Sequence, residues 1–571
     1  MVTLRGHAVR MLLLGMGLCT YAAVYAAPDA GSLLPPAPRE WPAPRPAPKL
    51  QLPDAPQTPE PNPAIPVVHI IGFVLEGEEI ISEAEFSAAV APFISRPINY
   101  ADLRAAAQAV AWAYRQAGWV VNATLPEQDV SDGIVRITVS HAVFGGVEVT
   151  GAQAADRRIA QVERYVTAQQ APGQPVRVEP LDRAMLLLND LPGVSATGAL
   201  REGQQAGETD FVVNLAPSVS QYGDVSFDNS GTRSAGYLRV LGNWNRAGLV
   251  HWGDQLSLNL IHSFTEYQTD GSDYQRLTYS LPLGYEGWRL TLGGSLFSYR
   301  LISSDYAGLG FAGDSDAWDV ELSYPMLRKE DHSLYLVGKV EHTHVDNEGA
   351  WVTVSRYRVE SRSIGLRGTM FDELGAGASS TASLTVNAGY LDLRDSPTQS
   401  SDASTTATGG TFTRLRYSLA RDQNLGRGFS VLAALNGQTA DKNLDSNQKF
   451  YLGGSNGVRV YPASEGSGYQ GFVLSLEARW KPAADWQLAA LYDYGYVTVN
   501  HDNDYSGASS LNEYCLRGYG LALAWHGKRK QTLSLTWARR IGENANATSA
   551  GNDQDGTYVR DRVWFNASLD F

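Results

Sequence analysis

The sequence predicts a mainly β protein, in which two tandem α+β modules precede a transmembrane antiparallel β-barrel of roughly 16 strands. The 571 residues include 56 glycines, 28 tyrosines, 16 phenylalanines and 13 tryptophans, whereas Asp, Glu, Lys and Arg together make up 19 %. This composition favours turns and strands over charged helices. A strand–helix–helix–strand–strand order also occurs twice between residues 67 and 216, and strand patterns alone continue from residue 217 to the end.

Charge and cysteine content exclude several classes of partner and cofactor. The formal net charge is −14 and the pI is about 5.2, so the chain lacks the basic character of nucleic-acid-binding proteins. We therefore expect no nucleic acid partner. Cys19 and Cys515 are the only cysteines, which excludes a disulfide framework and a cysteine-built metal site. No cofactor is predicted.

Residues 1–26 have the pattern of a secretory signal peptide. Arg5 and Arg10 precede the apolar run 11–18, and small residues lead to Ala26, after which we expect cleavage. The less favoured alternative is a membrane anchor, because the apolar run is shorter than the roughly 20 residues of a spanning helix. Removal of the signal peptide changes the net charge from −14 to −16.

The next segment, residues 27–66, is predicted to be a proline-rich linker. It contains 14 of the 27 prolines in the chain. Proline lacks a backbone N–H and disfavours helix interiors and strand ladders. We therefore expect an extended, mobile segment with no room for a capped helix of useful length.

Residues 67–142 are predicted to form the first α+β module. An apolar strand over 67–75 precedes Ser82 and Glu85, a capping-box pair that satisfies free N–H groups at the start of a helix. A second helix begins near Tyr100, carries one apolar face and stops at Gly118. Strands over 119–125 and 134–140 complete the module.

Residues 143–216 repeat this order and are predicted to form the second module. The expected strands cover 147–150, 194–200 and 209–215, and the expected helices lie around 159–166 and 181–188. The two spans contain 76 and 74 residues, so a tandem repeat is a better interpretation than one domain of 150 residues.

Residues 217–571 have the alternating pattern of outer-membrane strands. In 531–538, Leu533, Leu535 and Trp537 share one face, and small polar residues occupy the other. A soluble sandwich or propeller would also alternate. The barrel is favoured because short links alternate with long polar ones, aromatic residues lie near strand ends, and the last strand alternates up to the terminal Phe571.

Strand counting singles out one long connection. If each strand and its connection take about 22 residues, residues 217–571 contain roughly 16 strands. Because this number is even, both ends of the barrel segment lie on the same side of the membrane, which is the periplasmic side. Counting back from the C-terminus makes the 30-residue segment Asp441–Gln470 the sixth external loop. A loop of this length exceeds what a simple connection needs, so it is predicted to be functional.

Two groups of residues form motifs that resemble a known family. One consists of Tyr114, Gly118, Pro126, Gln128, Asp132 and Gly133. The other lies in the long loop and on the strands near it, and consists of Gly457, Val458, Arg459, Val460, Tyr461, Asp493 and Gly495. The first resembles the first POTRA module of two-partner secretion transporters, the TpsB class or haemolysin secretion/activation proteins. The second resembles the Val-Arg-Gly-Tyr and Phe-x-Asp-x-Gly motifs of that family, with Val460 in place of Gly and Leu491 in place of Phe.

The resemblance covers nearly the whole chain and implies a transporter rather than an enzyme. It would capture an unfolded large exoprotein in the periplasm and pass it through the barrel to the cell surface without ATP. The exoprotein would be a β-helical adhesin or haemolysin, and it could add a strand to an exposed POTRA edge. The other implied partners are outer-membrane lipid and the barrel-assembly machinery, which would act through the terminal strand and Phe571.

Members of the family often begin with a plug helix that occupies the pore. The prolines of residues 27–66 put a helical plug in doubt for this chain.

Strand alternation predicts how the loop motif would be held. Asp493 and Gly495 point into the lumen, as does Glu477 on the neighbouring strand. A long loop that folds into the pore would bring Arg459 to Asp493, with Glu477 nearby, and form a charge-assisted pair. From spacing alone a solvated arginine is the simpler interpretation, and the resemblance favours the pair.

Other patterns and alternatives carry less weight. Gly453–Gly457 fits Gly-x-Ser-x-Gly, but no strand precedes it and no helix follows it, as a hydrolase requires. His342 and His344 share a strand face without a third ligand, so no metal site is predicted. A barrel-assembly factor would usually carry more POTRA modules, and a passive porin would not need the two modules.

Overall fold

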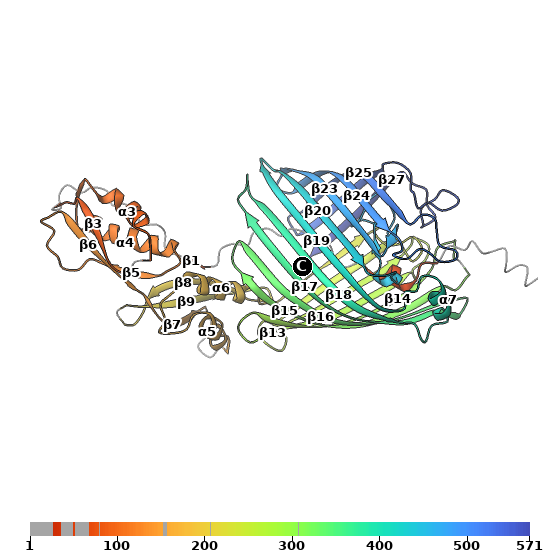
Figure 1. Ribbon diagram of the computed structural model, residues 1–571, viewed down its shortest axis with the longest axis horizontal. Coiled ribbons are helices and arrows are strands. Elements are labelled where there is room, and N and C mark those ends of the chain that lie inside the picture. The colour runs from red at the N-terminus through yellow and green to blue at the C-terminus, as the bar shows by residue number, and fades with distance from the viewer. Residues whose placement is uncertain are drawn as a thin grey trace, which may run out of the picture.

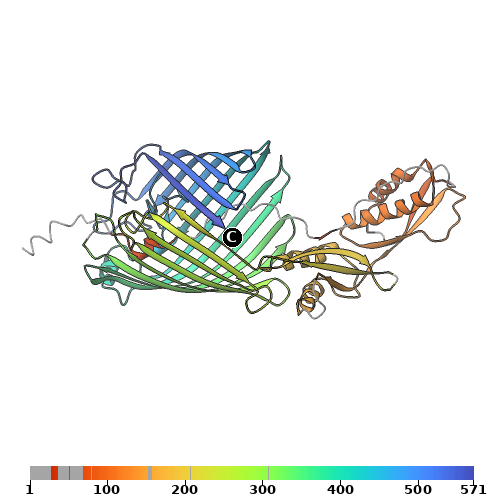
Figure 2. The ribbon, with the colours of Figure 1, turned by 180° about the vertical axis from the view of Figure 1, so that it is seen from behind.

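The structure is a computed structural model of the chain, in which two small modules extend from one end of a large barrel (Figures 1 and 2). It describes residues 27–35, 50–51, 68–78, 80–151, 157–205, 207–306 and 308–571. The predicted signal peptide and most of the predicted linker lie outside the described residues. Within the described residues, no helix combines the length and hydropathy needed to span a membrane.

The barrel is closed and antiparallel, and it contains sixteen strands within the described residues. This confirms the predicted fold class. Each strand pairs with its neighbours in chain order, apart from the inserted pair β21–β22. The barrel strands are β10 Gln221–Asp228, β11 Leu238–Ala247, β12 Gln255–Phe264, β13 Ser272–Leu283, β14 Trp288–Arg300, β15 Ala312–Arg328, β16 His332–Gly349, β17 Val352–Asp372, β18 Ala378–Asp392, β19 Gly410–Gly426, β20 Phe429–Ala440, β23 Gln470–Ala483, β24 Trp486–Thr498, β25 Glu513–His526, β26 Gln531–Arg540 and β27 Asp561–Asp570.

The first and last strands close the barrel, and the terminal residue takes part. β10 pairs with β27 from Asp224–Asp570 to Asp228–Asn566. Beyond this ladder, the N–H of Phe571 donates to the carbonyl of Gly223 at 2.9 Å, and the N–H of Gly223 donates back at 3.2 Å. Phe571 therefore extends the ladder that joins the two ends of the sheet.

Several strands are longer than the hydrocarbon layer requires. β15, β16 and β17 contain 17, 18 and 21 residues. A tilted strand needs about 9 to 11 residues to cross the hydrocarbon layer, so these strands continue beyond it. One of the long polar loops also contains a short helix, α7 (Gln399–Ser404).

The first module contains a three-stranded sheet, a short strand pair and two α-helices. β3 runs parallel to β6 and antiparallel pairing joins β6 to β5. Ser82 and Glu85 form the predicted capping box at the start of α3. The elements are β2 Val68–His69, β3 Gly72–Gly77, α3 Glu83–Val90, η1 Ala91–Phe93, β4 Pro97–Ile98, α4 Tyr100–Gln116, β5 Val121–Thr124 and β6 Ile134–His141.

The second module has the same connectivity. β7 runs parallel to β9, and β8 pairs with β9 in antiparallel fashion. The sheet has one further strand, because β1 pairs with the outer edge of β8. The exact domain boundaries at residues 142 and 216 stay predictions. The elements are β1 Leu50–Gln51, β7 Val143–Thr150, α5 Arg157–Gln169, α6 Val178–Asn189, β8 Ser195–Glu202 and β9 Glu208–Ala216.

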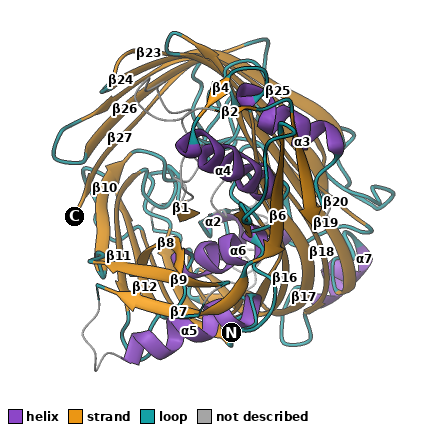
Figure 3. Ribbon diagram, turned by 90° about the vertical axis from the view of Figure 1, so that its left-hand side faces the viewer, coloured by secondary structure: helices purple, strands orange, loops and turns teal. Residues whose placement is uncertain are grey.

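The start of the predicted linker is not extended. Ala30–Leu33 form a helical turn, α2, which lies within the barrel (Figure 3). Asp29 and Ser32 form a capping box around it, and Ala30 is fully buried. The prediction of an extended segment was wrong at these residues, because residues 29–34 contain no proline and carry their own capping pair. The turn has four residues, so the absence of a capped helix of useful length stays a prediction.

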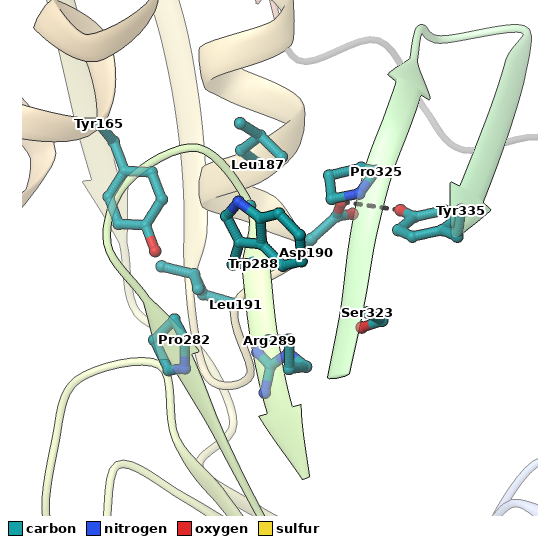
Figure 4. A pocket seen from close by; sticks show the side chains of 11 residues that line it. Tyr165, Leu187, Asp190, Leu191, Pro282, Trp288, Arg289, Ser323, Pro325 and Tyr335 are labelled. Atoms are coloured by element: carbon teal, nitrogen blue, oxygen red, sulfur yellow. Dashed lines mark hydrogen bonds between the residues drawn. The ribbon is translucent and has the colours of Figure 1, made fainter. Parts of the chain in front are cut away.

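The second module is docked on the short turns at one end of the barrel. Asp190, after α6, forms a bidentate pair with Arg328 at the end of β15, with both N–O distances at 2.8 Å. The guanidinium of Arg183 donates to the carbonyl of Pro325 at 2.9 Å. Figure 4 shows the cleft between the two parts, where Tyr165 and Leu187 of the module face Trp288 of the barrel. These contacts fix the module against the barrel rim.

Closure of the barrel predicts resistance to detergent. Because every strand is paired on both sides, no open edge remains where unfolding can begin. Unboiled protein should migrate faster in gel electrophoresis than boiled protein, and it should fractionate with the outer membrane. Recovery of the intact folded protein in the soluble periplasmic fraction would contradict the barrel.

The raised pKa of one carboxyl group near the docked interface predicts that docking depends on pH. Burial raises the pKa of Asp182 on α6 to about 6, and the charges of Glu330 and Asp331 on the facing turn act in the same direction. The ionised form is therefore disfavoured in the docked state, so docking is strongest below about pH 4 and weakens as the pH rises through 6. Hydrogen exchange of α6 should be severalfold faster at pH 8 than at pH 5, after correction for the intrinsic rate.

Asp182→Asn should remove most of this pH dependence and slow exchange at pH 8. Glu163→Gln is a matched control, because it removes one negative charge from the exposed face of α5 in the same module. It should retain the pH dependence of the natural chain. Equal pH dependence in Asp182→Asn and Glu163→Gln would refute this role of Asp182.

Candidate functional site

The sixth external loop folds back into the barrel between β20 and β23. A short ladder of β21 (Phe450–Tyr451) and β22 (Ser467–Gly468) forms its neck, after a 3₁₀ turn, η2 (Ser446–Gln448). Beyond the neck, Leu452 accepts from the N–H of Val458 at 2.7 Å, and its own N–H donates to Gly466 at 2.8 Å. Residues 452–466 are thus a compact, internally bonded tip.

The tip has an apolar base that packs on the inner barrel wall. Leu452, Val458, Val460 and Tyr461 are fully buried. They form one cluster with wall residues Val473, Val497, Tyr514, Leu516 and Ala538. Burial of these side chains holds the tip in place, because each contributes about 1.5 to 3 kcal/mol.

Arg459 lies in this tip and binds both predicted acids. Its Nε and Nη2 donate to the two carboxylate oxygens of Asp493, each at 2.8 Å, and its Nη1 donates to Glu477 at 2.6 Å. The exposed fractions are 9 % for Arg459, 1 % for Asp493 and 7 % for Glu477. The guanidinium is therefore enclosed and paired on two sides, in the bidentate geometry that arginine favours.

The acids reach the lumen because the strands alternate as predicted. On β24, Leu491, Asp493 and Gly495 are buried, whereas Tyr492 and Tyr494 are partly exposed on the other face. Asp493 is opposite Ser475 on β23, two residues from Glu477. Two adjacent strands thus present both acids to one side.

The network continues to a second arginine that the sequence analysis missed. Arg479 donates through Nε to Glu477 at 2.7 Å and through Nη1 to Asp422 at 3.0 Å. Its position two residues after Glu477 places both on one strand face, so the alternation could have identified it.

The last strand also holds the loop tip. The indole Nε1 of Trp564 donates to the carbonyl of Arg459 at 2.5 Å, and Nε of Arg562 donates to the carbonyl of Val460 at 3.3 Å. These residues were also missed. The last strand was predicted to alternate up to Phe571, so the residues at even positions, such as Trp564, face the lumen, and this alternation was the available signal.

Two wall glycines make room for the tip. A Cβ on Gly495 would lie 2.8 Å from Val458, and a Cβ on Gly518 would lie 2.7 Å from Val460. Val460 stands where the resembling family motif has Gly, and Gly518 on β25 supplies the space for its extra atoms. The Phe-to-Leu change at Leu491 keeps an apolar, buried side chain.

The external side of the tip is bonded to the final loop, residues 541–560. Asn544 donates to Glu465 of the tip at 3.0 Å and to Asp553 at 2.8 Å. Asp553 pairs with Arg540, whose guanidinium lies 4.6 Å from the ring centre of Tyr461. No sequence periodicity pointed to this group, because it joins two loops.

The helical turn α2 contacts the same loop from inside the barrel. Ser446 donates to Asp29 at 2.7 Å, and Ser464 donates to the carbonyl of Ser32 at 3.1 Å. On the wall, Asn347 accepts from the N–H of Ala30 at 2.8 Å. The described N-terminal residues thus occupy lumen space beside the loop.

The predicted POTRA motif residues lie at the C-terminal end of α4 and in the connection between β5 and β6 of the first module, far along the chain from the loop. Tyr114 is fully buried and donates to the carbonyl of Glu78, and Gly118 has φ +89° after α4. The carboxamide of Gln128 exchanges two bonds with the backbone of Arg136. In the same turn, the carbonyl of Pro126 also accepts from Gln128, Asp132 accepts from Ile134, and Gly133 has φ +74°.

The two histidines that share a strand face, His342 and His344, contact side chains of the neighbouring strand. His344 faces Asp316 at 3.3 Å, and His342 stacks on Trp318. In the described part of the chain, no three His, Cys, Asp or Glu side chains are grouped to hold a metal.

Comparisons with known proteins define the class. A family model described as haemolysin secretion/activation protein ShlB/FhaC/HecB matches residues 207–523, and a ShlB-type POTRA model matches 68–141. The protein is thus an outer-membrane transporter of the TpsB class, with periplasmic POTRA domains. Because the first match covers more than half of the chain, the chain belongs to the ShlB/FhaC/HecB haemolysin secretion/activation family.

Curated relatives of this chain are also named as transporters. The heme/hemopexin transporter protein HuxB of Haemophilus influenzae strain 86-028NP is 24 % identical over 475 residues, 82 % of each chain. The outer membrane transporter CdiB of Dickeya dadantii strain 3937 is 25 % identical over 446 residues, 76 % of each chain. Among solved structures, CdiB from Escherichia coli has a TM-score of 0.64 at 20 % identity, and covers 90 % of this chain and 93 % of that chain. This structural likeness shows the shared fold.

Removal of the Arg459 side chain should abolish most transport while sparing the barrel. Arg459→Ala leaves two buried acids without their shared cation, and breaking a buried pair costs about 3 to 5 kcal/mol. The strand ladders do not use this side chain, so the barrel should still insert. The ratio of secreted partner to barrel abundance should fall at least tenfold.

Two further variants sharpen the test. Arg560→Ala removes an exposed arginine that pairs with Glu543 in the final loop, and it should secrete normally. Arg459→Asp combined with Asp493→Arg restores opposite charges and should recover part of the activity. Full secretion by Arg459→Ala at normal abundance would exclude a transport role for the pair.

Proposed function

We propose that this transporter captures an unfolded exoprotein with its POTRA modules and passes it through the barrel under control of the sixth loop. The observation that carries the proposal is the enclosed pair between Arg459 and Asp493, which holds a long loop inside the pore. The contacts that hold this loop are ion pairs, hydrogen bonds and an apolar base, all of them non-covalent, so the loop has two positions available, in the lumen or displaced from it.

The exoprotein is a large secreted protein, and we propose a β-helical adhesin or haemolysin. The family resemblance supports this class. The relatives named HuxB and CdiB are transporters of the same family. The heme/hemopexin description belongs to HuxB and does not identify the cargo of this chain.

Passage needs no ATP in this proposal. The inward faces of β17 and β18 carry small polar side chains, among them Ser361, Thr381 and Asn387. Such a surface contacts an unfolded chain without strong binding. Folding of the exoprotein outside then favours outward movement.

The remaining proposed partners are outer-membrane lipid and the barrel-assembly machinery. Leu521, Leu523, Leu533 and Leu535 are exposed on the outer face of β25 and β26, as lipid contact requires. We propose that the barrel-assembly machinery acts through β27 and Phe571. The family match favours secretion over the barrel-assembly and porin alternatives.

Deletion of residues 67–216 tests the proposal. The signal peptide and barrel remain, so an inserted, heat-modifiable barrel is expected. Export of the partner exoprotein should fall to background, because capture is lost. The full-length chain is the positive control. Unchanged export by the deletion variant would favour a passive pore.

A further inference from the structure

A small apolar cavity lies between α5 of the second module and the turn that joins β13 to β14. Its volume is about 280 Å³, and Ala168 lines it from the helix. Trp288 lines both this cavity and the neighbouring cleft of Figure 4. The cavity is therefore part of the junction between module and barrel. The turn and the strand ends supply the remaining lining residues, which are Leu283, Gly284, Tyr285, Glu286 and Trp288.

The cavity lies at the end of the lipid-facing surface of the barrel. Leu277 on β13, Leu292 on β14 and Leu322 on β15 are exposed on this outer face. Strand alternation puts Trp288 and Tyr324 on the same face of β14 and β15, and their rings stack with centroids 4.5 Å apart. Tryptophan and tyrosine gather where the strands of a membrane barrel leave the hydrocarbon layer. The cavity is therefore placed at the membrane–water interface on the periplasmic side.

Helix α5 brings a cation to this cavity. Arg164 precedes Ala168 by one helical turn, so the two residues share a face of the helix. The Nη1 of Arg164 donates to the phenol oxygen of Tyr285 at 2.9 Å, and the guanidinium carbon lies 5.8 Å from the centre of the same ring. Arg164 is exposed and forms no ion pair with another described residue. A neutral phenol positions the guanidinium, so its charge is available to an anion.

The turn presents an anion to the same cavity. Glu286 lines the cavity, is exposed, and has no ion-pair partner in the described part of the chain. The preceding residue, Tyr285, packs edge-on against Tyr165 with ring centroids 5.3 Å apart, and its carbonyl accepts from Gln169 at 3.4 Å. These contacts fix the turn against α5. A cation and an anion are thus held beside one apolar space.

We propose that this cavity binds one phospholipid of the periplasmic leaflet that has a phosphoethanolamine headgroup. The guanidinium of Arg164 binds the phosphate, and the carboxylate of Glu286 binds the ammonium group. The glycerol and the first methylene groups fill the apolar space beside Trp288. Phosphatidylglycerol has the phosphate but no ammonium group, so Glu286 disfavours it. The inference goes beyond the proposed function, because it concerns the membrane and not the exported cargo.

The bound lipid would support the second module on its membrane side. The pair of Asp190 and Arg328 already joins α6 to the barrel. Figure 3 shows that α6 lies in front of the barrel opening, whereas α5 lies toward the edge. A lipid between α5 and the β13–β14 turn contacts both the module and the barrel at this edge. It therefore adds a second attachment, which depends on the composition of the membrane.

Lipid binding by the full-length chain tests the headgroup assignment. The protein is purified in detergent, stripped of lipid and mixed with equal amounts of phosphatidylethanolamine and phosphatidylglycerol. Native mass spectrometry then measures the affinity of the tightest-bound lipid. The natural chain should bind phosphatidylethanolamine at least fivefold more tightly than phosphatidylglycerol. Equal affinity for the two lipids, or a preference for phosphatidylglycerol, would overturn the proposal.

Charge variants assign the two parts of the headgroup. Arg164→Gln should weaken the binding of both lipids at least fivefold, because both carry the phosphate. Glu286→Gln should bind both lipids with nearly equal affinity, because the ammonium group loses its partner. Arg201→Gln is the matched control, since it removes an exposed arginine from β8 of the same module, and it should bind as the natural chain does. Equal binding by Arg164→Gln and Arg201→Gln would refute the site.

A filled cavity tests the apolar part independently of charge. Ala168→Trp places an indole in the space that the glycerol and methylene groups need, so the affinity for both lipids should fall at least fivefold. Ala168→Ser is the matched control, because it changes the same position and leaves the space open. Faster migration of the unboiled variants shows that their barrels are folded. Lipid affinities that do not differ between Ala168→Trp and Ala168→Ser would place the lipid elsewhere and overturn the proposal.

Discussion

The buried charge of Arg459 is the constraint on which the rest of the site depends. Removal of an ion from water costs several kcal/mol, so an enclosed guanidinium requires partners on every side. Asp493 and Glu477 provide them from two adjacent strands, and Trp564 fixes the backbone at the same residue. The wall glycines and the apolar base are then needed to bring the loop close enough for these bonds to form.

Much of this arrangement could be predicted because membrane strands alternate strictly. Lipid outside and water inside assign each residue of β24 to one face, so Asp493 was placed in the lumen from sequence alone. The capping box of α3 and the repeated module order were equally local signals. The pairing of Arg459 with Asp493 needed the family resemblance as well, because no periodic pattern relates a loop to a strand 34 residues away.

The features that were missed arise from contacts between segments without a shared period. The group of Glu465, Asn544 and Asp553 joins two irregular loops. The bonds of Asn189 to β8 depend on how α6 packs against the sheet. The turn at α2 had a local signal in Asp29 and Ser32, but the surrounding prolines obscured it, and its position in the barrel depends on residues more than 300 positions away.

The turn at α2 has a consequence for biogenesis. Its bonds join Asp29 to Ser446 and Ser32 to Ser464, across 417 and 432 residues. Contacts of such separation form late, because the loop that they close is long. The N-terminal residues are synthesised first, yet their binding site exists only after the barrel and its sixth loop have been built. The residues of α2 therefore occupy a site that is built by parts of the chain synthesised more than 400 residues later.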